Sequence, residues 1–214
     1  MGGEEAGMER TKIAVAPAVQ SGGALFTPEQ FALIGSVTEK DASIEVTPFK
    51  QLYIEVPAER EDAIRETLEG AGLDVFPAGF SVKFVACNFC KGAEDAGLGA
   101  ARELSRAVAG LKSPTPIKVG YAGCALGTSE PLLKEIGVVK MRDTFDIYVG
   151  GDPKGIKPAF ARLLVSGVTA ERLAPAVKSI IAYYVHYAKG KEKFKKFIDR
   201  VSWERLCEVA QASE

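Results

Sequence analysis

The chain has 214 residues, of which 47% are apolar and 26% charged, and its formal net charge is -1. This composition is typical of a globular protein with a packed core, arranged as one large or two small domains. It excludes a global electrostatic basis for binding nucleic acid or an anionic membrane, and no run approaches the roughly 18 apolar residues of a membrane-spanning helix.

The opening residues, 1–11, are polar and glycine-rich and lack the charged and apolar regions of a secretion signal. We therefore expect a flexible leader and a cytoplasmic location. In that compartment the four cysteines of the chain predict metal, redox or buried-thiol roles rather than structural disulfides.

The first half is predicted to alternate strands and helices in the order β-α-β-β-α-β, with the helices on one face of an antiparallel sheet. Thr27 and Gln30 form a capping box around Pro28, which suits the first helical position. Pro77-Ala78-Gly79 is the predicted domain boundary. The predicted strands are 12–19, 43–46, 50–56 and 73–76, and the helices are 28–37 and 58–71.

The second half is predicted to be an α/β domain with a helical tail. Its predicted strands are 82–86, 117–121 and 144–149, and its helices are 93–111, 132–136, 157–165, 170–188, 191–201 and 203–210.

Three cysteines fall in two glycine-bearing turns, each of which follows an apolar strand. Cys87 and Cys90 follow the strand 82–86, and Cys124 follows the strand 117–121. Two such turns can be brought side by side at one end of a sheet. The pattern indicates a soft, thiolate-rich site.

The ordered motifs resemble the nitrite and sulfite reductase family, in particular its small single-chain members, over about residues 12–205. The motifs that carry the resemblance are Phe26–Gln30, Thr47–Ile54, Leu68–Leu73, Ala86–Cys87 with Phe89–Lys91, Gly123–Cys124, Glu135–Val138 and Tyr148–Gly151. The resemblance implies an α+β fold: a ferredoxin-like half domain over 12–78, then an α/β siroheme and iron–sulfur domain over 79–214 with a helical tail.

The resemblance also implies a function. A 4Fe-4S cluster would pass electrons from a donor protein to siroheme, where a small oxyanion, sulfite or nitrite, is reduced. Cys87, Cys90 and Cys124 would bind the metal. Large family members carry the half domain twice, so self-association could supply a second copy to this chain.

Two departures from the family pattern affect the cysteines. The first two cluster cysteines of the family are usually six residues apart, whereas Cys87 and Cys90 are three apart, and Cys90 fits the family position better. Thr128 stands where the family has the fourth cysteine, which also bridges the cluster to siroheme. A neutral hydroxyl is a poor substitute for a soft thiolate. The fourth ligand is then Thr128, an external ligand or Cys207.

Several interpretations of the thiols stay open. Cys-x-x-Cys spacing also suits zinc, with His186 as a further ligand, or a redox dithiol. Alternatively, the thiols are unliganded. A non-catalytic relative that binds a tetrapyrrole, or a cluster alone, for electron transfer or regulation is the rival hypothesis.

Siroheme carries many carboxylates, so its pocket requires cations. Lys50 and Lys83 are the candidates for this role and for catalysis, and Lys91 and Lys118 come next; the alternative for each is a solvated surface lysine. Gly150-Gly151 would let backbone amides approach a cofactor, or would form a plain turn. The run Lys189–Lys196 is a solvated helix face or a donor-docking patch. The complete predicted cofactor-binding set is Lys50, Gln51, Lys83, Asn88, Lys118, Gly123, Thr128, Gly150 and Gly151.

Overall fold

The computed structural model describes residues 9–79, 81–154 and 156–212, so most of the predicted leader lies outside the described residues. The chain divides into two compact units. The first contains the described residues up to Ala18 together with Ala24–Ala78, and the second contains Val19–Gly23 and the chain from Gly79 onward. Among the described residues, no helix has the length and apolar character needed to cross a membrane.

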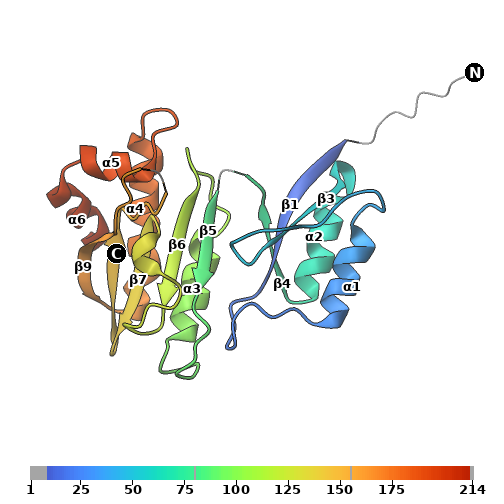
Figure 1. The fold of residues 1–214 in the computed structure, drawn as a ribbon, viewed down its shortest axis with the longest axis horizontal. Helices are drawn as coiled ribbons and strands as arrows, with labels where there is room; N and C mark the ends of the chain where they lie inside the picture. The colour runs from blue at the N-terminus through green and yellow to red at the C-terminus, as the bar shows by residue number, and fades with distance from the viewer. Residues whose placement is uncertain (1–8, 80, 155, 213–214) are drawn as a thin grey trace, which may run out of the picture. The chain divides into compact units, whose positions relative to one another are not determined.

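The first unit is a four-stranded antiparallel sheet in the order β2-β3-β1-β4, with helices α1 and α2 on one face (Figure 1). Ile13, Val15 and Ile54 of the sheet share a core with Ile34 of α1 and Leu68 of α2. The elements are β1 (Arg10–Pro17), α1 (Pro28–Val37), β2 (Glu45–Val46), β3 (Leu52–Pro57), a short 3-10 turn (Ala58–Arg60), α2 (Glu61–Gly70) and β4 (Leu73–Pro77).

Helix α1 confirms the predicted capping box. The Thr27 hydroxyl accepts from the Gln30 amide at 3.2 Å, and the Gln30 side chain accepts from the Thr27 amide at 3.0 Å. These two bonds satisfy N–H groups that have no partner within the helix. The Gln30 side chain also donates to the Ala71 carbonyl at 2.9 Å, which ties the start of α1 to the end of α2.

The second unit is a five-stranded mixed sheet in the order β5-β6-β7-β8-β9 (Figure 1). Strands β5, β6 and β7 are parallel, and β8 and β9 continue the sheet antiparallel. The elements are β5 (Val82–Ala86), α3 (Leu98–Val108), β6 (Ile117–Ala122), the 3-10 turn η2 (Pro131–Leu133), β7 (Ile136–Met141), β8 (Thr144–Val149), β9 (Arg162–Val168), α4 (Ala170–Tyr187), α5 (Phe194–Arg200) and α6 (Trp203–Gln211).

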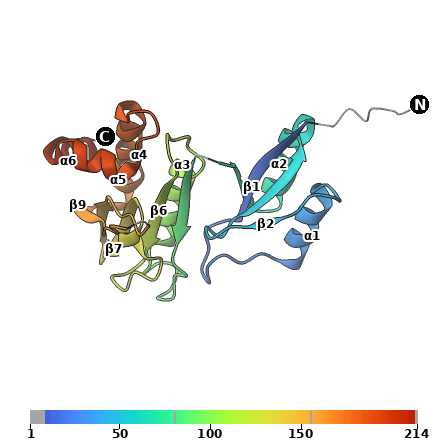
Figure 2. The same cartoon turned by 45° about the horizontal axis from the view of Figure 1, so that its top comes forward.

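Helices α3 and α4 share the core of this unit with the sheet, and α5 and α6 lie beside α4 (Figure 2). The fully buried Tyr184 of α4 has edge-on ring contacts with Phe194 and Phe197 of α5. The α+β fold and the helical tail predicted from the sequence are therefore confirmed.

Two element predictions are wrong. Residues 157–165 were expected to be helical, but Arg162–Val168 forms the edge strand β9. The apolar run Leu163-Leu164-Val165 suits either element, and pairing with β8 decides between them. Residues 132–136 form only the end of η2 before the strand β7 begins, and β7 was not predicted.

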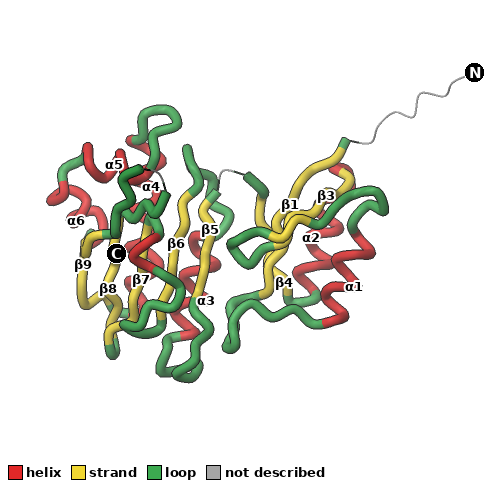
Figure 3. The backbone as a smooth tube through the Cα atoms, viewed as in Figure 1, coloured by secondary structure: helices red, strands yellow, loops and turns green. Residues whose placement is uncertain are grey.

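A third prediction is too long at both ends, because the helix expected over 93–111 is restricted to Leu98–Val108. The connections that follow β5 and β6 are mostly loop, as Figure 3 shows. These loops carry Cys87, Cys90 and Cys124.

Candidate functional site

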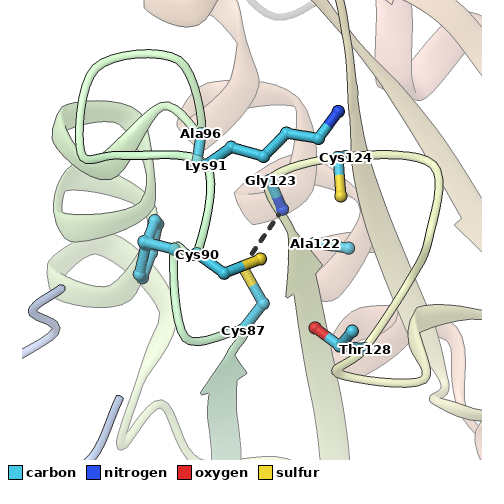
Figure 4. A pocket seen from close by; sticks show the side chains of 9 residues that line it. Cys87, Cys90, Lys91, Ala96, Ala122, Gly123, Cys124 and Thr128 are labelled. Atoms are coloured by element: carbon cyan, nitrogen blue, oxygen red, sulfur yellow. Dashed lines mark hydrogen bonds between the residues drawn. The ribbon is translucent and has the colours of Figure 1, made fainter. Parts of the chain in front are cut away.

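The topology of the second sheet brings the two cysteine-bearing turns together. Strands β5 and β6 run parallel, with Val82 paired to Ile117 and Ala86 to Tyr121. Their carboxyl ends therefore share one edge of the sheet. The turn after β5 carries Cys87 and Cys90, and the turn after β6 carries Cys124 (Figure 4).

The two turns enclose a small hollow. Its volume is about 10 Å³, which is room for roughly one water molecule. All three thiols predicted to bind metal line it, together with two residues of the predicted cofactor-binding set, Gly123 and Thr128. The full lining is Cys87, Phe89, Cys90, Lys91, Ala96, Ala122, Gly123, Cys124 and Thr128.

The first turn is fixed by buried groups. Phe89 lies between the two cysteines, is 2% exposed and stacks on Tyr121 with a centroid distance of 6.0 Å. Its φ of 54° is in the left-handed region, which a bulky residue adopts only when its surroundings hold it there. This turn buries Cys87 and leaves Cys90 exposed. The carbonyl of Asn88 accepts from the Gly22 amide at 3.0 Å.

The second turn contacts the first through Gly123. Its N–H donates to the Cys87 sulfur at 3.3 Å. A Cβ atom at this position would lie 2.7 Å from the Ala96 carbonyl oxygen, so only glycine fits without displacing the backbone. Ser129 donates from its hydroxyl to the Tyr121 carbonyl at 2.6 Å.

Tyr121 lies beneath both turns. Its hydroxyl lies 2.8 Å from the Ala96 carbonyl and 3.0 Å from the Gly97 carbonyl. Burial, followed by the nearby Cys87, raises the pKa of Tyr121 far above its usual value. The side chain is therefore a neutral hydrogen-bond donor that supports the loop before α3.

The donor set fits three corners of an iron–sulfur cluster. Thiolates are its usual ligands, and backbone N–H groups commonly bond to its sulfurs, as Gly123 bonds to Cys87. Within the described ranges, no group of three or more His, Cys, Asp or Glu residues is arranged to hold a metal ion. The hollow has room for roughly one water molecule, so it must widen before it can hold a cluster of several iron and sulfur atoms.

Other residues predicted to bind a cofactor lie at the opposite end of the second sheet, where its parallel strands begin. Lys83 and Lys118 are paired near the starts of β5 and β6. Lys83 is 4% exposed, and the Lys118 ammonium lies 3.3 Å from the Glu135 carboxylate. Gly150 donates to the Glu135 carbonyl, so the predicted glycine pair is near this group and not near the thiols.

A close contact with another backbone segment explains why position 151 is a glycine. A Cβ atom there would lie 2.3 Å from the Lys134 carbonyl oxygen. The glycine therefore permits a close approach between two backbone segments.

Lys50 and Gln51 belong to the first unit. Lys50 is exposed and has a φ of 60°, whereas Gln51 is 4% exposed. In the described part of the chain, no hydrogen-bond donor reaches the buried side-chain oxygen of Gln51. A buried polar atom without a partner is rare in folded proteins.

A larger groove of about 700 Å³ lies beside the hollow and was not predicted, because β7 is not among the strands predicted from the sequence. The tip of the β7–β8 hairpin reaches the thiol edge of the sheet and carries charged side chains. The sequence feature that could have indicated this hairpin is a two-residue turn between two apolar runs. The groove is lined by Lys91, Asp95, Gly123, Cys124, Ala125, Lys140, Met141, Arg142 and Asp143.

Two further candidates lie away from the hollow. Cys207 is on α6, and its sulfur is 3.6 Å from the Leu164 carbonyl of β9. His186 is exposed on α4, where its ring contacts Tyr187 edge-on. Neither lines the space between the two thiol turns.

Comparison with known proteins identifies the family. The model of the nitrite and sulphite reductase 4Fe-4S domain matches residues 86–214. The chain is 27% identical over 190 residues to cobalt-factor III methyltransferase of Priestia megaterium, covering 89% of this chain and 35% of that protein. It is 22% identical over 209 residues to an assimilatory-type sulfite reductase of Nitratidesulfovibrio vulgaris, covering 93% of each.

The fold is similar to the crystal structure of dissimilatory sulfite reductase I, with a TM-score of 0.70, 11% identity and coverage of 94% of this chain and 69% of that one. At this level of identity the similarity shows the α+β fold. The chain belongs to the nitrite and sulphite reductase 4Fe-4S domain family.

Proposed function

We propose that this chain is an iron–sulfur redox protein whose Cys87, Cys90 and Cys124 hold a 4Fe-4S cluster. The observation that carries the proposal is that these three thiols, from two separate turns, line one hollow in a protein of this family. A bound cluster of this type supplies one-electron transfer. We further propose residues 79–214 as the cluster-binding domain and 12–78 as the ferredoxin-like half domain.

The residues around the thiols have distinct roles in this proposal. The Gly123 N–H stabilises negative charge on the Cys87 sulfur. Phe89 and Tyr121 keep water from the buried side of Cys87. The exposed Cys90 gives an electron-donor protein a short route to the site.

Anaerobic reconstitution with iron and sulfide tests the proposal. We expect a brown protein whose iron and sulfide contents are equal, and loss of both in Cys87→Ser, Cys90→Ser and Cys124→Ser. Cys207→Ser is the matched control and should retain the cluster. A colourless protein without iron would overturn the proposal.

The same assay distinguishes the two other thiol chemistries. Bound zinc without sulfide would favour a zinc site. A metal-free protein in which Cys87 and Cys90 oxidise together would favour a redox dithiol.

A second candidate function is reduction of sulfite or nitrite at siroheme. It is supported by the 93% coverage of a protein named as a sulfite reductase. It is also supported by the side-chain oxygen of Gln51, which is buried and has no hydrogen-bond donor among the described residues, so that a ligand would satisfy it. Lys50, which is exposed in the first unit, would offset the carboxylates of siroheme and the charge of the oxyanion.

Siroheme binding is tested by adding siroheme to the reconstituted protein and recording its absorption bands and its reductase activity with a reduced dye. We expect Gln51→Leu to weaken siroheme binding while the iron content stays unchanged. If the iron–sulfur protein binds no siroheme, the alternative is a non-catalytic electron carrier. The similarity of most of this chain to a methyltransferase is compatible with that alternative.

A further inference from the structure

The formal net charge of -1 combines two parts of the chain that carry opposite charge. Residues 9–78, which contain most of the first unit, carry 12 acidic and 6 basic side chains, whereas residues 79–214 carry 14 acidic and 21 basic ones. Two short segments concentrate this difference. Residues 58–70, which end with α2, contain five acidic and two basic side chains, and residues 186–200, which end with α5, contain two acidic and six basic ones.

The acidic segment presents carboxylates along one side of α2. Asp62 and Glu66 are exposed and four residues apart, so they lie on the same face of the helix. Among the described residues neither carboxylate has an ion-pair partner, whereas Glu61 is paired with Arg65 at 3.1 Å. Like charges at this spacing repel each other and lower the stability of the helix. We call Asp62 and Glu66 the acidic face.

The basic segment presents ammonium groups at the start of α5. Lys193 and Lys196 are exposed and lie one turn apart. Over the part of the chain that the structure describes, neither ammonium has an ion-pair partner, whereas Arg200 is paired with Glu192 at 2.7 Å. Cations near the start of a helix are disfavoured by its dipole, so the stability of α5 does not explain these lysines. We call Lys193 and Lys196 the basic face.

An exposed aromatic ring accompanies each face. Phe31 of α1, which lies beside α2 (Figure 1), is 51% exposed. Tyr187, at the end of α4, is 53% exposed, and its carbonyl accepts from the Arg200 guanidinium of α5 at 2.9 Å. Aromatic side chains are enriched in protein interfaces, where charged groups surround an apolar centre. Each face therefore combines unpaired charge with apolar area.

We propose that the acidic face of α2 docks on the basic face of α5 in a second copy of this chain. The partner is assigned by charge complementarity, because this chain itself carries both surfaces. Since the two faces differ, each copy can offer its acidic face and receive one in return, which gives a two-fold dimer with two equivalent contacts. The inference goes beyond the proposed redox function and does not depend on a bound cluster.

The first test measures self-association at two salt concentrations by analytical ultracentrifugation of the full chain. Added salt shortens the Debye length from about 30 Å at 0.01 M to about 10 Å at 0.1 M. We expect dimers at the lower salt concentration and an affinity about tenfold weaker at the higher one, as befits a few exposed ion pairs. A protein that is monomeric at both, or a dimer whose affinity ignores salt, would overturn the proposal.

The second test exchanges the charges of the two faces. Lys193→Glu with Lys196→Glu makes both faces acidic, and Asp62→Lys with Glu66→Lys makes both basic. Each double variant alone should associate about 100-fold more weakly than the wild type, because like charges then meet at both contacts. An equal mixture of the two variants should restore dimers that contain one chain of each, because both contacts then join opposite charges.

Two further variants control this test. Lys140→Glu with Arg142→Glu changes the net charge equally at the tip of the β7–β8 hairpin, at the opposite end of β8 from α5, and should retain the dimer. Lys193→Gln with Lys196→Gln removes the charge without reversing it and should weaken association less than the glutamate pair does, which keeps the test available if a reversed variant does not fold.

The mixing experiment decides the outcome. If the mixed variants stay monomeric, or if the hairpin variant loses the dimer as fully as the α5 variant does, the docking of α2 on α5 is overturned. Iron and sulfide contents are measured separately, so failure of the proposed iron–sulfur function would leave this inference standing, and the reverse also holds.

Discussion

The turns after β5 and β6 lie at one edge of the same sheet but are built differently. The first places Phe89 in the core, with 2% exposure, and buries Cys87. The second exposes Leu126 to 77% and leaves Cys124 partly exposed. Because the second turn is the more exposed of the two, it can move while the first stays in place. Such a movement would widen the 10 Å³ hollow and leave the fold intact.

One carbonyl joins the two turns. The Tyr121 carbonyl accepts from the Cys87 amide of the first turn at 3.0 Å and from the Ser129 hydroxyl of the second at 2.6 Å. Because the first turn is buried and the second is exposed, we expect substitutions in the first turn to lower the global free energy of unfolding. Substitutions in the second turn should change its local mobility.

Phe89→Ala should have the largest effect on stability. It removes a buried ring from the contact with Tyr121 and leaves a cavity, so we expect a loss of about 3 kcal/mol in the free energy of unfolding. Denaturant unfolding measures this loss. Leu126→Ala in the second turn is the control, with an expected change within about 0.5 kcal/mol. Equal losses in the two variants would refute the distinction between a rigid and an open turn.

Gly123→Ala should affect the contact between the turns. The added methyl group would clash with the Ala96 backbone, so we expect a loss of about 2 kcal/mol and a longer bond from residue 123 to the Cys87 sulfur. Gly99→Ala in α3 is the matched control, because the new side chain meets nothing within 4 Å. That variant should gain about 0.5–1 kcal/mol from improved helix propensity.

The helices and strands of the first unit could be predicted because short sequence motifs define them. The capping box at Thr27 and the alternation of Leu52, Ile54 and Val56 each determine an element within a few residues. Strand β9 could not be predicted in this way, because its apolar run suits a helix equally well and pairing with β8 decides the outcome.

The candidate site was only partly predictable for the same reason. The three cysteines and Thr128 were found because each lies in the turn after a recognisable strand. Lys140 and Arg142 were missed because they reach the site only through β7. The charge on Lys118 was identified, but its pairing with Glu135 depends on a loop and a strand that lie 17 residues apart in the chain.

Tyr121→Phe should have a smaller, pH-dependent effect. Losing the hydroxyl leaves the Ala96 and Gly97 carbonyls without this donor, at a cost of about 1 kcal/mol near neutral pH. Because the pKa of Tyr121 is raised in the folded protein, the unfolded chain loses this proton first as pH rises above about 10. The stabilisation from Tyr121 is thus present below that pH and is lost above it.

Unfolding measured between pH 8 and 11 checks this prediction. The difference in stability between the wild type and Tyr121→Phe should shrink above pH 10, because phenylalanine has no proton to lose. A constant difference across that range would show that the tyrosine ionises equally in both states.

Ser129→Ala should have the smallest effect on stability and the clearest effect on mobility. The Tyr121 carbonyl keeps the Cys87 amide as a donor, so the loss should be about 0.5 kcal/mol, at the low end for one hydrogen bond. Hydrogen exchange should quicken at residues 123–128 and stay unchanged at 87–92, because only the second turn loses an anchor. Faster exchange in both turns would mean that they move as one unit, and a cluster would then have to enter by opening the whole edge of the sheet.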